Sequence, residues 1–152
     1  MRIRAGIVLI KDKQVALIER HRAGLNYFVF PGGGVDEGES PEQAAVREAM
    51  EELGIEVTIL QKVAEIQLGP KSRQVYFLVE QTGGEFGTGA GEEYTDSDPN
   101  SPEEGIYIPV WMPIDKLPLY QNIYPADVAR LVVKSVQDGW AAAAPVLFEE
   151  PK

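Results

Sequence analysis

Three glutamates and one arginine lie close together in the sequence, at spacings that place them on neighbouring turns of a helix. Residues 40–54 read SPEQAAVREAMEELG and include Arg47, Glu48, Glu51 and Glu52. Side chains three or four positions apart adjoin each other on a helix, so we expect these carboxylates to crowd together. Arg47 precedes Glu51 by four residues and can neutralise part of their charge. The remaining oxygens predict an anionic site suited to Mg²⁺ or Mn²⁺, which prefer oxygen ligands.

The same segment carries the signals of a capped helix. Ser40 can cap it, Pro41 suits its first turn, and Gln43 completes a capping box. We expect the helix to run to Leu53 and to stop at Gly54 in a left-handed conformation. Projected at 100° per residue, one arc of this helix is apolar and should face the core. That arc comprises Ala45, Val46, Ala49, Met50 and Leu53. Glu48, Glu51 and Glu52 fall on the opposite arc, which should face away from the core.

A glycine run precedes the helix. Pro31 is followed by Gly32, Gly33 and Gly34, directly after the apolar segment 27–30. Glycines let the backbone approach an ion or a phosphate without an intervening side chain. Taken alone, this run also suits a tight turn, and three glutamates also suit an ordinary solvated helix face. The order of glycine bend, capped helix, arginine and three acids favours a metal site.

Composition limits the remaining choices. The chain has 152 residues, 44% of them hydrophobic, as expected for a single globular domain. It lacks cysteine and has one histidine, His21, which excludes thiolate and histidine-rich metal sites. A formal net charge of −10 argues against nucleic-acid polymers or an anionic membrane as partners. With no signal peptide or long apolar run, we expect the protein in the cytoplasm.

Residues 33–55 resemble the Nudix box, G-x5-E-x7-R-E-U-x-E-E-x-G-U, where U is aliphatic. Every fixed position is filled, with Glu39 at the first acidic position and Ala49 and Ile55 in the aliphatic slots. The resemblance implies an α/β fold, the Nudix α/β/α sandwich, with a mixed β-sheet between helices. It also implies that Glu48 and Glu52 lead in binding Mg²⁺, that Glu51 assists, and that the Gly32 carbonyl adds a backbone ligand. Arg47 and Glu39 are then expected to orient these ligands, and Glu48 is the family-based candidate for the general base.

Helix and strand patterns alternate along the chain in agreement with such a sandwich. A turn at Asp12-Lys13 joins the first two expected strands, and a second helix is expected from Tyr124 to Trp140. A further turn is expected at residues 115–118. We assign residues 1–140 to a single domain and residues 141–152 to a C-terminal tail in which Leu147 and Phe148 are able to dock. The expected strands cover 4–11, 14–20, 27–30, 55–66, 73–81 and 107–114.

The segment from Gly87 to Gly105 is long, acidic and rich in Gly, Ser and Pro. Loops of this kind are often lids or binding loops, and plain disorder is the alternative. In relatives of this family, an acidic residue from this region often completes the metal site. It precedes the strand that in this chain carries Trp111. The candidates are Glu92, Glu93, Glu103 and Glu104, of which we choose Glu104.

Substrate residues are less clearly marked. Arg20 and Arg22 end the second strand and can hold phosphate, or are simply surface charges. The aromatic side chains of Tyr27, Phe28, Tyr76 and Trp111 can stack on a base, or belong to the core; Phe28 is our choice. In some relatives, a proline about fifteen residues past the box accompanies ADP-ribose specificity. Pro70 lies fifteen residues after Ile55 in this chain.

The sequence thus predicts a Mg²⁺-dependent (or Mn²⁺-dependent) hydrolase of the pyrophosphate linkage in a nucleoside diphosphate joined to a group X. A small nucleotide is the expected substrate, with a MutT-like nucleoside triphosphate preferred and ADP-ribose as the alternative. A Nudix-like domain that binds a nucleotide without cleaving it is a second alternative. A homodimer is compatible with the sequence, which leaves the oligomeric state open.

Overall fold

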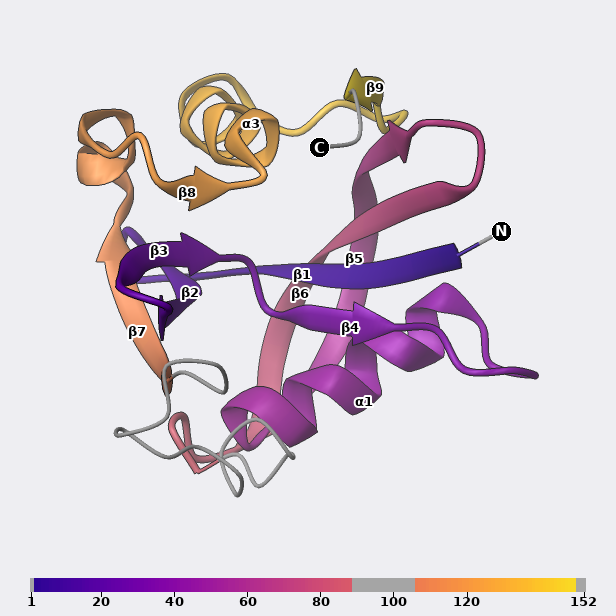
Figure 1. Ribbon diagram of the computed structural model, residues 1–152, viewed down its shortest axis with the longest axis horizontal. Helices are drawn as coiled ribbons and strands as arrows, with labels where there is room; N and C mark the ends of the chain where they lie inside the picture. The colour runs from indigo at the N-terminus through magenta and orange to yellow at the C-terminus, as the bar shows by residue number, and fades with distance from the viewer. Residues whose placement is uncertain (1, 89–105, 150–152) are drawn as a thin grey trace.

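The computed structural model describes residues 2–88 and 106–149, which form one mixed β-sheet with a helix on each face (Figure 1). The strands are β1 (Arg2–Lys11), β2 (Gln14–Arg22), β3 (Leu25–Val29), β4 (Gly32–Gly34), β5 (Ile55–Leu68), β6 (Ser72–Gly84), β7 (Ile106–Pro113), β8 (Ile123–Tyr124) and β9 (Val146–Glu149). The helices are α1 (Pro41–Leu53), the 3-10 helix η1 (Ile114–Leu119) and α3 (Ala126–Asp138).

The predicted first hairpin is confirmed. Asp12 and Lys13 connect β1 to β2 with φ values of 52° and 63°. Positive φ at both central residues matches the twist of an antiparallel hairpin. The hairpin is paired only at its closed end, where Ile10 faces Val15 and Lys11 faces Gln14.

Beyond that end the sheet divides into two groups of strands. β1 continues with β6 in parallel and with the short strand β4, where Gly6 faces Gly32. β2 instead pairs with β3 and β7. The glycine run, expected as a bend, is therefore a strand alongside β1. Glycine is required at Gly32 because a Cβ there would lie 2.3 Å from the Ala5 carbonyl oxygen.

Two hydrophobic cores lie on opposite faces of the sheet, because successive side chains of a strand point to opposite sides. In β1, Ile7 and Leu9 pack on the α1 side while Val8 packs on the α3 side. In β6, Phe77 packs on the α1 side and Tyr76 on the α3 side. The predicted α/β/α sandwich with a mixed sheet is thus confirmed, and Figure 1 shows α1 and α3 on either side of the strands.

The C-terminal third differs from the prediction in three details. The expected turn at residues 115–118 is the 3-10 helix η1, and the short strand β8 was not predicted. Within the expected tail, residues 146–149 form β9, which pairs in parallel with β5. Leu147 packs against the α3-side core, so this segment does dock.

Candidate active site

The capped helix is present as predicted. The Ser40 hydroxyl accepts a hydrogen bond from the Gln43 N–H at 3.1 Å, and the Gln43 side chain accepts one from the Ser40 N–H at 2.8 Å. Gly54 ends α1 with φ 75° in the left-handed region. These local contacts fix where α1 begins and ends, and so fix the position of every glutamate along it.

The buried face of α1 differs from the predicted arc. Ala45, Ala49 and Leu53 are buried as expected, but Val46 and Met50 are 38% and 43% exposed. Glu48 and Glu52, expected to face away from the core, are each only 7% exposed. The projection was wrong for these four residues because the glycine strand β4 leaves room for carboxylates against α1. The buried face of α1 therefore includes Glu48 and Glu52 instead of Val46 and Met50.

The glycine strand forms the floor of this carboxylate site. A Cβ on Gly33 would lie 2.3 Å from the Glu48 Oε1 atom, so the carboxylate occupies the space that any other residue would fill. The backbone N–H of Gly32 donates a hydrogen bond to the Glu52 Oε1 atom at 3.3 Å. The predicted association of bare glycine backbone with helix carboxylates is therefore observed for Glu48 and Glu52.

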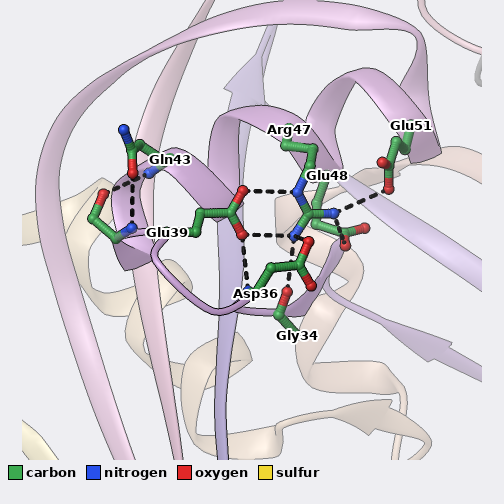
Figure 2. A network of polar contacts seen from close by, with 8 residues as sticks. Gly34, Asp36, Glu39, Gln43, Arg47, Glu48 and Glu51 are labelled. Carbon is green, nitrogen blue, oxygen red and sulfur yellow. Dashed lines mark hydrogen bonds and ion pairs between the residues drawn. The ribbon is translucent and has the colours of Figure 1, made fainter.

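Arg47 lies at the centre of a hydrogen-bond network (Figure 2). Its guanidinium donates two hydrogen bonds to Glu39, at 2.8 and 2.9 Å. It also donates to Glu48 at 2.8 Å, to Glu51 at 3.2 Å and to the Gly34 carbonyl oxygen at 2.9 Å. The network ties α1 to the end of β4 and limits the orientations of two of the three helix glutamates.

The loop between β4 and α1 closes the network. Glu39 accepts a hydrogen bond from the Asp36 N–H at 3.0 Å, and the Asp36 carboxylate lies 3.6 Å from Arg47. The Arg47 guanidinium, helped by the Asp36 N–H, lowers the pKa of Glu39 from 4.5 to about 2. The hydrogen bond to Glu39, followed by the contact with Glu48, raises the pKa of Arg47. Both groups therefore stay charged at neutral pH.

The donor set fits a hard divalent cation. Glu48, Glu51 and Glu52 offer carboxylate oxygens along α1, and the absence of a Cβ at Gly33 admits the Glu48 carboxylate beside the backbone of β4. The three carboxylates are nevertheless not gathered around one point: across residues 2–88 and 106–149, no group of three His, Cys, Asp or Glu side chains is arranged to hold a metal. Glu48 and Glu51 both accept hydrogen bonds from the Arg47 Nη1 atom, whereas Glu52 accepts one from the Gly32 N–H. The four loop candidates, Glu92, Glu93, Glu103 and Glu104, lie outside the described residues.

Of the predicted substrate residues, Arg20 lies between two aromatic rings. Its guanidinium carbon is 4.3 Å from the centroid of Tyr107 and 5.4 Å from that of Tyr27. Its Nη2 atom donates a hydrogen bond to the Tyr107 hydroxyl. Arg20 falls on the α1 face of β2, since it is two residues from Ile18, which packs in the α1-side core. Tyr107 was not predicted as a site residue, and only its place opposite Arg20 on β7 marks it.

The other candidates lie elsewhere. Arg22 is exposed at the end of β2. Phe28 packs against the α3-side core and meets Tyr120 edge-on at 5.4 Å, so the structure does not bring it to the glutamates. Tyr76 is buried in the same core. Trp111 is on the α1 side, stacked on Phe86 at 4.5 Å.

Comparison with known proteins identifies the class to which this fold and site belong. The family model of the NUDIX domain matches residues 1–131, so the chain belongs to the Nudix family. CTP pyrophosphohydrolase of Escherichia coli K12 is 33% identical over 127 residues, which cover 81% of this chain and 91% of that protein. The 8-oxo-dGTP diphosphatase of Proteus vulgaris is 40% identical over 62 residues, 38% of this chain and 54% of that protein. The match therefore spans only about half the length of this relative.

A solved structure supports the fold. The Nudix hydrolase from Nitrosomonas europaea superposes with a TM-score of 0.72 at 17% identity, covering 98% of this chain and 78% of that one.

None of the helices in the described parts has the length and apolarity needed to cross a bilayer.

Proposed function

We propose that the protein is a divalent-metal-dependent hydrolase that cleaves the pyrophosphate linkage of a small nucleotide, with a nucleoside triphosphate as the preferred substrate class. The observation that carries this proposal is the burial of Glu48 and Glu52 against the glycine strand, beside an arginine that is already bonded to three glutamates. Two nucleotide pyrophosphohydrolases among the relatives, named for CTP and 8-oxo-dGTP, support the reaction class.

The chain's own residues divide the work as follows. Glu48, Glu51 and Glu52 would hold Mg²⁺ or Mn²⁺, with the Gly32 carbonyl as a backbone ligand and Glu104 as our candidate from the acidic loop. When bound, the cation supplies charge neutralisation at the phosphates and a lowered pKa of the attacking water. Glu48 is our candidate for accepting the proton of that water. Arg47 and Glu39 position the ligands, because each Arg47 N–H bond restrains a carboxylate that would otherwise rotate.

The substrate would lie on the α1 face across the division of the sheet. One side of this division carries the glutamates and the glycine strand, and the other carries Arg20. The Arg20 guanidinium carbon lies near the rings of Tyr27 and Tyr107, and its Nη2 atom donates to the Tyr107 hydroxyl, so its other N–H groups would bind a phosphate oxygen. We retain Arg20 and Arg22 as phosphate candidates, and Phe28 as the weakest substrate candidate because of its position on the opposite face.

The test is release of phosphate or pyrophosphate from nucleoside triphosphates, ADP-ribose and dinucleoside polyphosphates, with Mg²⁺ or with EDTA. Glu52→Gln keeps the shape of the side chain and should lower the turnover number by roughly 100-fold or more. Glu42→Gln is the matched control, because Glu42 is exposed on the first turn of the same helix.

The outcomes separate the alternatives. Hydrolysis of a triphosphate that requires Mg²⁺ and is lost only in Glu52→Gln supports the proposal. Preferential cleavage of ADP-ribose would change the proposed substrate class but would leave the proposed reaction, hydrolysis of a pyrophosphate linkage, in place. Tight nucleotide binding with no cleavage of any substrate would identify a binding domain instead.

A further inference from the structure

A groove of about 600 Å³ lies on the α3 side of the sheet, between α3 and the chain segment that includes η1 and β8. One wall is a stripe of α3 that contains Ala129 and Val133, and the other contains Leu117 and Ile123. The residues of the helix wall recur at spacings of three and four, so they follow one side of α3 over about three turns. The apolar residues of both walls, Leu117, Ile123, Ala129 and Val133, are also part of the α3-side core or pack against it.

The groove is separate from the candidate active site. The buried residues of α3, including Val128 and Val132, belong to the core on one face of the sheet, whereas Ala45 and Ala49 of α1 belong to the core on the other. Figure 1 shows the two helices with the strands between them. A molecule in the groove would therefore not compete with a substrate at the glutamates.

The charge of the groove is opposite to that of the chain. Arg130 and Lys134 lie one turn apart on its helix wall, and none of the described residues that line it is acidic. The whole chain has a net charge of −10. Arg130 pairs with Asp127, while Lys134 has no ion-pair partner within the described ranges. Two cations four residues apart on a helix repel each other, and a shared anion would relieve that repulsion.

We propose that this groove binds a small anionic amphiphile, a molecule with an apolar ring or chain and one negatively charged head. The apolar body would lie against Leu117, Ile123 and Val133, and the head would be held by Lys134 and Arg130. The volume favours a small molecule, because it falls within the range of about 300–1,000 Å³ typical of small-ligand pockets.

The test uses two fluorescent probes that share a ring system, titrated into the full chain. One, 1-anilinonaphthalene-8-sulfonate, carries a sulfonate; the other, N-phenyl-1-naphthylamine, is uncharged. We expect the sulfonate probe to bind at one site, about tenfold more tightly than the neutral probe. Lys134→Glu should lower the affinity for the sulfonate probe by about tenfold, because a side chain that attracts the sulfonate is replaced by one that repels it. Lys134 is exposed, so the variant should unfold at the same temperature as the unaltered protein.

Lys116→Glu is the matched control, with the same charge change at an exposed lysine of η1 that does not line the groove. This variant should change the affinity for the sulfonate probe by no more than about twofold, since salt screens the interaction between the probe and an exposed charge outside the groove. Equal binding of the two probes, or equal losses in the Lys116 and Lys134 variants, would overturn the proposal. So would displacement of the probe by an acidic amphipathic peptide but not by decanoate, which would make the groove a protein-docking surface.

Discussion

At the scale of single residues, the position of the Glu48 carboxylate depends on the absence of a side chain at Gly33. Gly33 has no unusual φ, so its importance lies in the space it leaves for the Glu48 carboxylate. The sequence predicted this closeness of glycine and glutamate. It did not predict that Gly32 would donate to Glu52, because the Gly32–Glu52 contact depends on how β4 pairs with β1.

Gly33→Ala should therefore displace Glu48 without unfolding the protein. The added Cβ would meet the Glu48 carboxylate at 2.3 Å, and a shift of the carboxylate should lower the turnover number by about 10- to 100-fold. Turnover and circular dichroism of the variant measure the two effects. Gly34→Ala is the control, since nothing lies within 4 Å of a Cβ there. Equal activities of the two variants would contradict the role of Gly33.

Arg20 has a planar guanidinium between Tyr27 and Tyr107, and a lysine cannot reproduce either the stacking or the forked N–H edge. Arg20→Lys should raise KM for a nucleoside triphosphate by about tenfold and leave kcat within about threefold. Arg130→Lys, at an exposed position of α3 on the opposite face of the sheet, should leave both constants unchanged. Steady-state kinetics of the two variants decide this, and an unchanged KM for Arg20→Lys would remove Arg20 from the phosphate site.

At the scale of elements, α1 was predictable because its signals are local. Ser40, Gln43 and Gly54 lie in the sequence next to the helix ends that they cap, and the structure places each as expected. The buried face of α1 was not predictable in the same way. Whether Met50 or Glu52 is buried depends on the neighbouring strand, and no property of the helix sequence reveals that β4 lies there.

Ser40→Ala should destabilise the protein by about 1 kcal/mol, because it leaves the Gln43 N–H without its side-chain acceptor. Ser40→Asp retains an acceptor and should cost much less. The free energy of unfolding in urea measures both. A loss of the same size in the two variants would show that the hydrogen bond from Gln43 is not what stabilises the start of α1.

At the scale of the whole molecule, the order of the expected strands and helices agreed with the sandwich that the resemblance to the Nudix box implied, and the structure has that sandwich. The short strands β8 and β9 were missed, since two and four residues carry no periodic signal and form through pairing with distant strands. Tyr107 was missed as a site residue for the same reason, because it meets Arg20 only through the pairing of β7 with β2.

Acid should weaken the folded protein through Glu39. Its pKa is lowered from 4.5 to about 2, so below pH 4.5 the unfolded chain binds a proton that the folded protein does not. The stabilisation from Glu39 is therefore complete above pH 4.5 and is lost progressively as the pH falls toward 2. The difference in unfolding free energy between the unaltered protein and Glu39→Gln should shrink over this interval. For the exposed Glu42→Gln the same difference should not change with pH, and a constant difference for Glu39→Gln would contradict this linkage.

The incomplete hairpin has a mechanical consequence. Because β1 and β2 share only the pairs Ile10–Val15 and Lys11–Gln14, the two strand groups form two arms that pair with each other at that end and are connected again where the chain passes from β3 to β4. A nucleotide bound by Arg20 on one arm and by the glutamates on the other would connect the two arms where β1 and β2 are not paired. Amide hydrogen exchange should then slow together on both arms when a nonhydrolysable nucleotide is added.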